Sequence, residues 1–190
     1  PYKTRKKTIF TDDKFELLME RDEFFTKEER ELLFSLYKKL LRLTGETLQK
    51  GDCRKLKKHL IDSTQNNTMQ RDSFGLNPVI KDMQTAVIVA EEIGMKRASI
   101  LGIMLHTPVR CHSYTIEYIQ QEYGEDVAGI IRGLIKINDL YDKSPTIESE
   151  NFRNLLLSCA EDMRGILIMI ADRVNVMRQI KAAEYDAARC

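Results

Sequence analysis

The chain has 190 residues, of which 43% are hydrophobic, so it is long enough to bury the core of one domain. Its 30 basic and 29 acidic residues give a formal net charge of +1, which excludes binding to DNA or to an anionic membrane through overall charge. The four cysteines have no CxxC spacing, which disfavours a structural zinc site and favours free thiols in the cytoplasm.

Apolar residues spaced by three and four dominate the chain and strict alternation is absent, which predicts an all-α fold. Thr26–Glu29 has the pattern of a capping box and predicts a helix start there. Gly45 is the expected stop, although Glu46–Gln49 could continue the helix. A second helix is expected over Cys53–Ile61, with Asp52 as its cap. One apolar face of the first helix is predicted to contain Leu32, Leu33, Leu36, Leu40 and Leu43.

The segment Ser63–Pro78 is rich in polar residues, Gly and Pro, and it predicts a long loop. Further helices are expected over Val79–Ile93, Lys96–His106, Thr115–Tyr123, Glu125–Tyr141, Ile147–Cys159 and Ala160–Ala183. Glycine and proline should separate them, at Gly94, Pro108, Gly124 and Ser144-Pro145. The strongest apolar run, Gly165–Ala171, is too short to span a bilayer, so no membrane association is expected.

Three blocks of sequence carry a family resemblance. In Ile100–Gly124 an apolar helix leads into Leu-His-Thr-Pro-Val-Arg-Cys, then Thr-Ile-Glu-Tyr-Ile and Tyr-Gly. Glu125–Ile137 contains Glu-Asp-Val and Gly-Leu-Ile-Lys-Ile. Glu150–Val174 contains Glu-Asn-Phe-Arg-Asn-Leu-Leu-Leu, Asp-Met-Arg-Gly-Ile-Leu-Ile and Ala-Asp-Arg-Val. In this order, from Asp82 to Ala183, the chain resembles the hydrolase domain of the RelA/SpoT homologues, which make and degrade the alarmone (p)ppGpp.

The resemblance implies a compact multi-helix bundle of the HD type. Its core would be residues 76–190, and residues 1–75 would be a helical segment and loop of the same domain. In such proteins a (p)ppGpp synthetase domain follows, so we expect one beyond residue 190, reached through Ala182–Cys190. Because the chain begins at Pro1 without an initiator Met or an apolar signal core, we interpret it as excised from a longer protein.

In active members of this family, two His and two Asp hold a manganese ion that activates a water molecule. The resemblance places the first metal-binding His at Asp82, the second at His106, its partner Asp at Thr107 and the last Asp at Asp172. A neutral threonine is a poor replacement for a charged ligand, so metal affinity should fall. We therefore expect these four remnant positions to be unoccupied and no cofactor to be bound.

The catalytic and nucleotide-binding positions depart from the family pattern as well. The acidic pair falls on Arg110 and Cys111, and an arginine cannot act as a general base near neutral pH. We therefore expect neither residue to be functional in catalysis. The resemblance places the nucleotide-binding Arg-Lys pair of the family at Ser73 and Phe74 and its Asn at Val176, and all three depart from the pattern. The neighbouring Asn175 could take the place of that Asn after a small shift of the helix.

The resemblance thus implies a degenerate, inactive hydrolase-like domain that regulates a GTP pyrophosphokinase, an enzyme that transfers pyrophosphate from ATP to GTP or GDP in the stringent response. Its partner would be the synthetase domain of the parent chain, and the family also allows ribosome association of that parent. One alternative is a Mn²⁺-dependent guanosine-3′,5′-bis(diphosphate) 3′-pyrophosphohydrolase with a variant metal site. A second is a non-catalytic sensor that binds (p)ppGpp or another guanine nucleotide.

Several of these residues also have purely structural interpretations. We interpret His106 as a packing or capping residue, and Asp172 with Arg173 as an ion pair within the chain or a helix contact. The basic helix that carries His59 is interpreted as a solvated face. Three methionines at near-helical spacing are interpreted as core filler: Met163, Met169 and Met177.

Overall fold

The first helix begins where the capping box predicts. In the computed structural model, which describes residues 24–65, 71, 75–143, 157 and 162–187, α2 covers Lys27–Thr44. Thr26 Oγ1 accepts a hydrogen bond from the Glu29 amide at 3.2 Å, and the Glu29 carboxylate accepts one from the Thr26 amide at 3.0 Å. Gly45 is the C-cap, which confirms the predicted end. The predicted apolar face is wrong in part, because Leu32 and Leu43 are exposed.

Helix α3 covers Asp52–Gln65 and is longer than predicted at both ends. Asp52 Oδ2 accepts a hydrogen bond from the Gln49 amide at 2.7 Å and another from Arg97 Nε at 2.7 Å. Burial alone would raise the pKa of Asp52, but these hydrogen bonds outweigh it and lower that pKa. The ion pair thereby fixes the start of α3 against the start of α5. The predicted loop begins later than Ser63, and half of the predicted segment lies outside the described residues.

Helix α4 covers Pro78–Ile88 and continues as the π-helical turn η1, Val89–Ile93. Asn77 caps α4, since its side-chain oxygen accepts a hydrogen bond from the Val79 amide at 3.0 Å. Gly94 ends η1 with a φ of 77°, the left-handed conformation that glycine adopts without strain. The predicted helix over Val79–Ile93 is therefore confirmed in extent.

Helix α5 covers Arg97–Arg110, so the predicted break near Pro108 is wrong. Proline has no amide hydrogen, and Pro108 therefore leaves the carbonyl of Met104, four residues earlier, without its helical donor. The His59 side chain on α3 hydrogen-bonds to the Met104 backbone instead. His59 is buried, so its interpretation as part of a solvated face is also wrong. A side chain from α3 thus replaces a missing helical hydrogen bond in α5.

The remaining described helices are α6 (Ile116–Tyr123), α7 (Glu125–Lys143) and α9 (Met163–Ala187). Thr115 caps α6, because its hydroxyl accepts a hydrogen bond from the Tyr118 amide at 3.2 Å. The helix predicted over Ala160–Ala183 is confirmed, although it begins later and ends later. The helix predicted over Ile147–Cys159 falls almost entirely outside the described residues.

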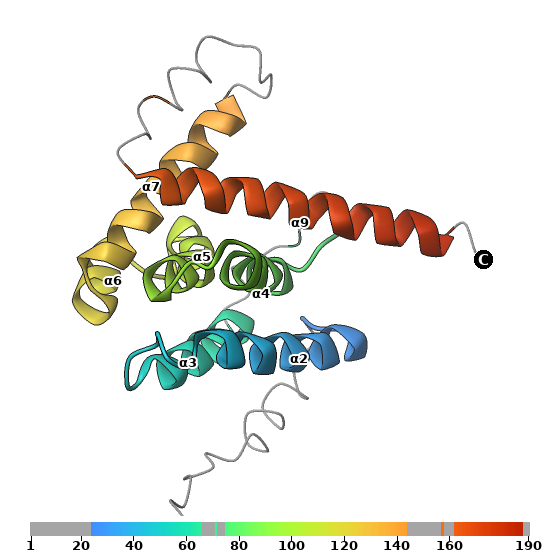
Figure 1. Cartoon of the computed structure of the whole chain (residues 1–190), viewed down its shortest axis with the longest axis horizontal. Coiled ribbons are helices and arrows are strands. Elements are labelled where there is room, and N and C mark those ends of the chain that lie inside the picture. The colour runs from blue at the N-terminus through green and yellow to red at the C-terminus, as the bar shows by residue number, and fades with distance from the viewer. Residues whose placement is uncertain (1–23, 66–70, 72–74, 144–156, 158–161, 188–190) are drawn as a thin grey trace, which may run out of the picture.

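Helices α4 and α5 form the middle of the bundle (Figure 1). Helix α4 contacts α2 on one side and α9 on the other, while α5 contacts α7. Helices α5 and α7 approach closely because Gly102 has no side chain: a Cβ atom there would lie 2.6 Å from Ile130 Cγ2. The described residues contain helices and no strand, so the predicted all-α fold is confirmed.

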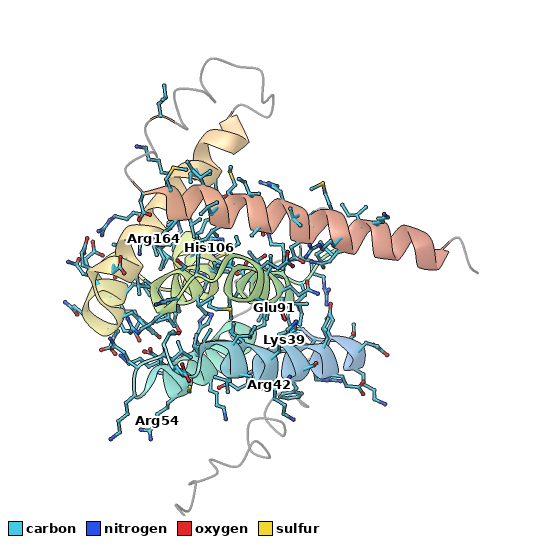
Figure 2. The ribbon with its side chains drawn as sticks, in the orientation of Figure 1. Lys39, Arg42, Arg54, Glu91, His106 and Arg164 are labelled. Atoms are coloured by element: carbon cyan, nitrogen blue, oxygen red, sulfur yellow. The ribbon has the colours of Figure 1, made fainter. Side chains whose placement is uncertain are left out.

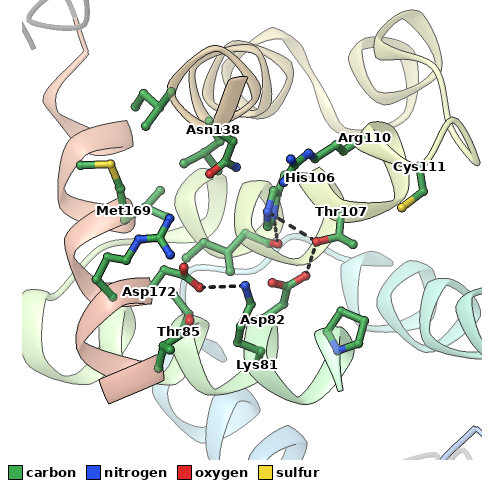
Figure 3. Close-up of a pocket in the computed structure, with 17 residues that line it drawn as sticks. Lys81, Asp82, Thr85, His106, Thr107, Arg110, Cys111, Asn138, Met169 and Asp172 are labelled. Atoms are coloured by element: carbon green, nitrogen blue, oxygen red, sulfur yellow. Dashed lines mark hydrogen bonds and ion pairs between the residues drawn. The ribbon is translucent and has the colours of Figure 1, made fainter. Parts of the chain in front are cut away.

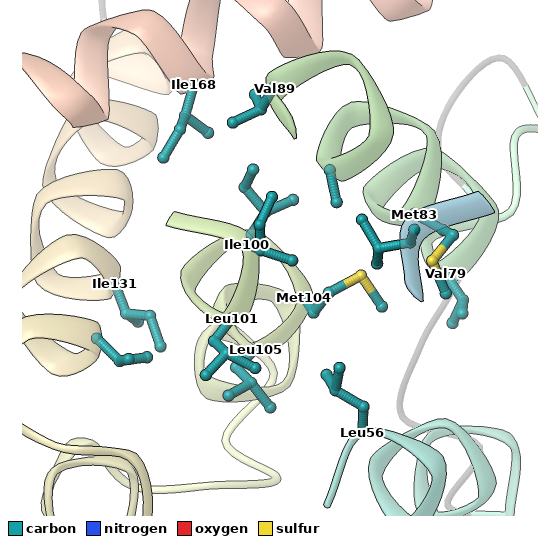
Figure 4. Packing of buried hydrophobic residues seen from close by; sticks show 14 of the residues in the cluster. Leu56, Val79, Met83, Val89, Ile100, Leu101, Met104, Leu105, Ile131 and Ile168 are labelled. Atoms are coloured by element: carbon teal, nitrogen blue, oxygen red, sulfur yellow. The ribbon is translucent and has the colours of Figure 1, made fainter. Parts of the chain in front are cut away.

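One hydrophobic core connects the N-terminal helices with the middle of the bundle (Figure 4). Leu33 on α2 and Leu56 on α3 are buried in the same cluster as Leu105 on α5 and Ile131 on α7. Among the described helices, none combines the length and the apolar character required to cross a bilayer.

The interpretation of the three methionines as core filler is wrong for two of them. Met163 is 54% exposed and Met177 is 61% exposed on α9. Met169 is half-buried, and it lines the cavity described below.

We expect His59 to make stability depend on pH. Burial lowers the pKa of His59 to about 4, from a usual value of 6.5. The unfolded chain therefore binds more protons than the folded chain between these values, so stability is complete above pH 6.5 and falls as the pH drops towards 4, by about 3 kcal/mol. Urea unfolding at a series of pH values should show this loss in the wild type.

The His59→Gln variant should have a smaller pH dependence, because glutamine can donate to the Met104 carbonyl but does not titrate. The exposed His112 provides the matched control, and His112→Gln should keep the wild-type pH dependence. Equal slopes for wild type and His59→Gln would contradict the assignment.

Candidate functional site

Helices α4, α5, α7 and α9 surround a cavity of about 570 Å³ (Figure 3). Within α4 and α5, the lining residues recur at intervals of three and four, so each helix turns one face towards the cavity. The polar and charged residues that line it are Lys81, Asp82, Thr85, His106, Thr107, Arg110, Cys111, Asn138, Asp172 and Arg173.

The structure brings together most of the residues that the sequence singled out. The residues on α4 and α5 meet those on α9 although up to about 90 positions separate them in the chain. The ones that line this cavity are Asp82, His106, Thr107, Arg110, Cys111, Asp172 and Val176.

Three predicted nucleotide-binding positions are not part of this arrangement. Ser73 and Phe74 lie outside the described residues. Asn175 is buried, and its Nδ2 donates to the Lys81 carbonyl at 3.0 Å and to Thr85 Oγ1 at 3.1 Å. The Asn175 side chain therefore joins α9 to α4, while Val176 beside it lines the cavity.

Asp82 is the most deeply buried charged group of the site, with only 4% of the residue exposed. Its Oδ2 accepts a hydrogen bond from the Thr107 hydroxyl at 2.7 Å. Burial raises the pKa of Asp82, while the nearby charges of His106 and Lys81 and the Thr107 hydrogen bond act in the opposite direction. The carboxylate is thus held by groups of the chain itself.

His106 projects from α5 beside Thr107 (Figure 3). Its Nδ1 lies 2.7 Å from the carbonyl oxygen of Ile103, so Nδ1 carries the hydrogen of that bond. Its Nε2 lies 3.4 Å from the Thr107 hydroxyl. His106 is therefore inside α5 and not at its end, and one ring nitrogen anchors the ring to its own helix.

Asp172 on α9 faces Lys81 on α4, and Asp172 Oδ1 lies 3.5 Å from Lys81 Nζ. The lysine and aspartate side chains are 24% and 23% exposed, so solvent screens this ion pair only in part. Asp172 is thus a member of an ion pair, as interpreted, but this partner is Lys81 and not the Arg173 that was named with it. The sequence reasoning missed Lys81, although its place on the same helical face as Asp82 and Thr85 was a usable signal.

The arrangement does not fit the metal ion that the family resemblance implies. Thr107 contributes a neutral hydroxyl, which already donates to Asp82, and Asp172 faces an ammonium group. Within the described part of the chain, no three His, Cys, Asp or Glu side chains are grouped so that they could hold a metal ion. The absence of a bound metal in solution stays a prediction.

The family model described as HD domain matches residues 62–189 of the chain. The chain is 32% identical over 58% of its length to a guanosine-3′,5′-bis(diphosphate) 3′-pyrophosphohydrolase of Aquifex aeolicus, covering 16% of that protein. It is 27% identical over 69% of its length to the GTP pyrophosphokinase rsh of Brucella melitensis, covering 18% of it. It is 24% identical over 81% of its length to the bifunctional (p)ppGpp synthase/hydrolase SpoT of Escherichia coli, covering 22% of it.

The chain therefore spans less than a quarter of the length of these relatives. No solved structure matches it.

We expect the Thr107 hydroxyl to be needed for stability. Thr107→Val keeps the shape of the side chain but removes the donor to Asp82, and an unsatisfied buried acceptor costs about 1–3 kcal/mol. Thr107→Ser keeps the hydroxyl and should lose less. Denaturant unfolding at neutral pH measures both variants, and a Thr107→Val variant as stable as wild type would show that Asp82 does not depend on this bond.

Proposed function

Because this chain belongs to the HD domain family, we propose that it is the hydrolase-like domain of a (p)ppGpp-metabolising protein and that it does not itself hydrolyse the alarmone. The observation that carries this proposal is the state of the two carboxylates in the cavity. Asp82 accepts a hydrogen bond from Thr107, and Asp172 faces Lys81. Both groups therefore interact with other side chains of the domain.

The side chains at the catalytic positions support the same conclusion. Hydrolysis of a pyrophosphate ester requires an activated water and a group that accepts its proton. Arg110 is a permanent cation and cannot accept a proton near neutral pH. Cys111 is a half-buried thiol at the edge of the same cavity. The chain thus lacks an acidic side chain at both positions where the family has one.

On this proposal the domain regulates the synthetase activity of its parent, a GTP pyrophosphokinase in the cytoplasm. Similarity to relatives named as GTP pyrophosphokinase and as bifunctional synthase/hydrolase supports this role. The mechanism would be conformational: the packing of the domain against the synthetase domain differs between active and inactive states, and that difference biases the equilibrium. Helix α9 would carry the signal, because Asn175 and Asp172 join it to α4.

A hydrolysis assay tests the central claim. We expect the purified chain, incubated with ppGpp and Mn²⁺, to release no more pyrophosphate than a buffer control. The full-length Aquifex aeolicus relative, assayed in parallel, is the positive control for substrate and metal. Robust release that His106→Ala abolishes would contradict the proposal and support the alternative, a Mn²⁺-dependent 3′-pyrophosphohydrolase with a variant metal site.

The charges around the cavity favour one second candidate, a sensor that binds the alarmone without cleaving it. Lys81, Arg110 and Arg173 line the cavity together with His106, whereas Asp82 and Asp172 are the acidic groups that line it among the described residues. Arginine and lysine bind phosphate oxygens directly and need no metal ion to do so. A volume of about 570 Å³ is within the range of small-molecule sites.

Titration calorimetry with ppGpp tests this candidate. If the alarmone binds in the cavity, Arg110→Glu should weaken binding by roughly 10-fold or more, because a charge-assisted hydrogen bond contributes about 1.5–3 kcal/mol. Arg42→Glu reverses an exposed charge on α2, away from the cavity (Figure 2), and should bind like wild type. No heat of binding in the wild type would remove the sensor role and leave the regulatory role intact.

A further inference from the structure

We propose that Lys81 supplies, from within the chain, the positive charge that a metal ion would supply between the carboxylates of this cavity. The domain then keeps its α4–α9 contact without a metal ion. This inference deepens the proposed loss of hydrolysis, since it names the group that makes a metal unnecessary.

Carboxylates on two different helices make a positive charge necessary here. Asp82 on α4 and Asp172 on α9 line the same cavity, and the charge of Asp172 adds to burial in raising the pKa of Asp82. The family pattern of two His and two Asp also carries two negative charges, which a divalent ion would offset. This chain keeps two carboxylates in the cavity, so it needs cations or hydrogen-bond donors of its own.

The position of Lys81 meets that need. Figure 3 shows its ammonium group between the carboxylates of Asp172 and Asp82. Its Nζ lies 3.5 Å from Asp172 Oδ1, and its charge acts on Asp82 as well. The Thr107 hydroxyl also donates a hydrogen bond to Asp82 Oδ2, at 2.7 Å. Lysine and threonine together therefore serve both carboxylates.

Helix α9 contacts Lys81 at two points, its backbone carbonyl and its ammonium group. Asn175 Nδ2 donates to the Lys81 carbonyl at 3.0 Å, and Asp172 lies opposite the Lys81 side chain. Asp172 and Asn175 are three residues apart and share one face of α9. The backbone and the side chain of a single α4 residue thus bind the same face of α9.

Thermal unfolding of designed variants tests this inference. The Tm of the wild type should be the same with excess MnCl₂ and with EDTA. Lys81→Met should lower the Tm by about 2–4 °C, the shift expected when a domain of this size loses one partly buried ion pair. Lys81→Arg keeps the charge and should stay close to wild type. Lys136→Met removes an exposed lysine on α7 and should leave the Tm unchanged.

A double variant separates charge neutralisation from general packing. If Lys81 offsets the charge of Asp172, Lys81→Met with Asp172→Asn should regain most of the Tm lost in Lys81→Met alone. Additive losses, an unchanged Tm in Lys81→Met, or a wild-type Tm that rises with MnCl₂ would each overturn the inference. Failure of the proposed function would appear separately, as pyrophosphate release in the hydrolysis assay.

Discussion

The buried carboxyl group of Asp82 constrains how the helices at the centre of this domain pack. Burial raises the pKa of Asp82, so the ionised form of this carboxyl group depends on nearby donors and positive charges. Those groups come from two elements: Thr107 lies on α5, and Lys81 lies beside Asp82 on α4. Lys81 in turn faces Asp172 on α9. The positions of α4, α5 and α9 are therefore linked through the contacts of Asp82 and its neighbour Lys81.

Most of the fold follows from local sequence. The capping box at Thr26–Glu29, the stop at Gly45 and the glycine after η1 act over one helical turn, and the structure confirms each of them. Pro108 shows where local reasoning fails. The rule that proline ends a helix assumes that the freed carbonyl has no other donor, and here His59 provides one from α3. A partner about 45 residues away is invisible to a local rule.

The candidate site, too, could be predicted from the sequence only in part. The spacing of the HD motif in the sequence assigns Asp82, His106 and Asp172 to one site. In the structure all three line the same cavity. Comparison with the family motif shows only which metal ligands are kept, so Thr107 is identified only as the position of a lost ligand. The structure shows that the threonine has a bond of its own to Asp82. Lys81 was missed because it matches no motif position, and only the packing of α9 against α4 shows its role.

The π-helical turn η1 is a place where this domain could lose one residue with little effect on the cavity. A π turn contains one residue more than a regular turn, and within it the adjacent Glu91 and Glu92 reach different helices. Glu91 pairs with Lys39 on α2, and Glu92 pairs with Arg178 on α9. Loss of one residue within η1 would return the segment to a regular helix without rotating Asp82. Loss of a residue within α4 before Asp82 would instead turn the preceding part of the helix by about 100° relative to the cavity. Within α4 and η1, the wide turn is therefore the place where a single-residue deletion disturbs the cavity least, at the expense of one of the two ion pairs.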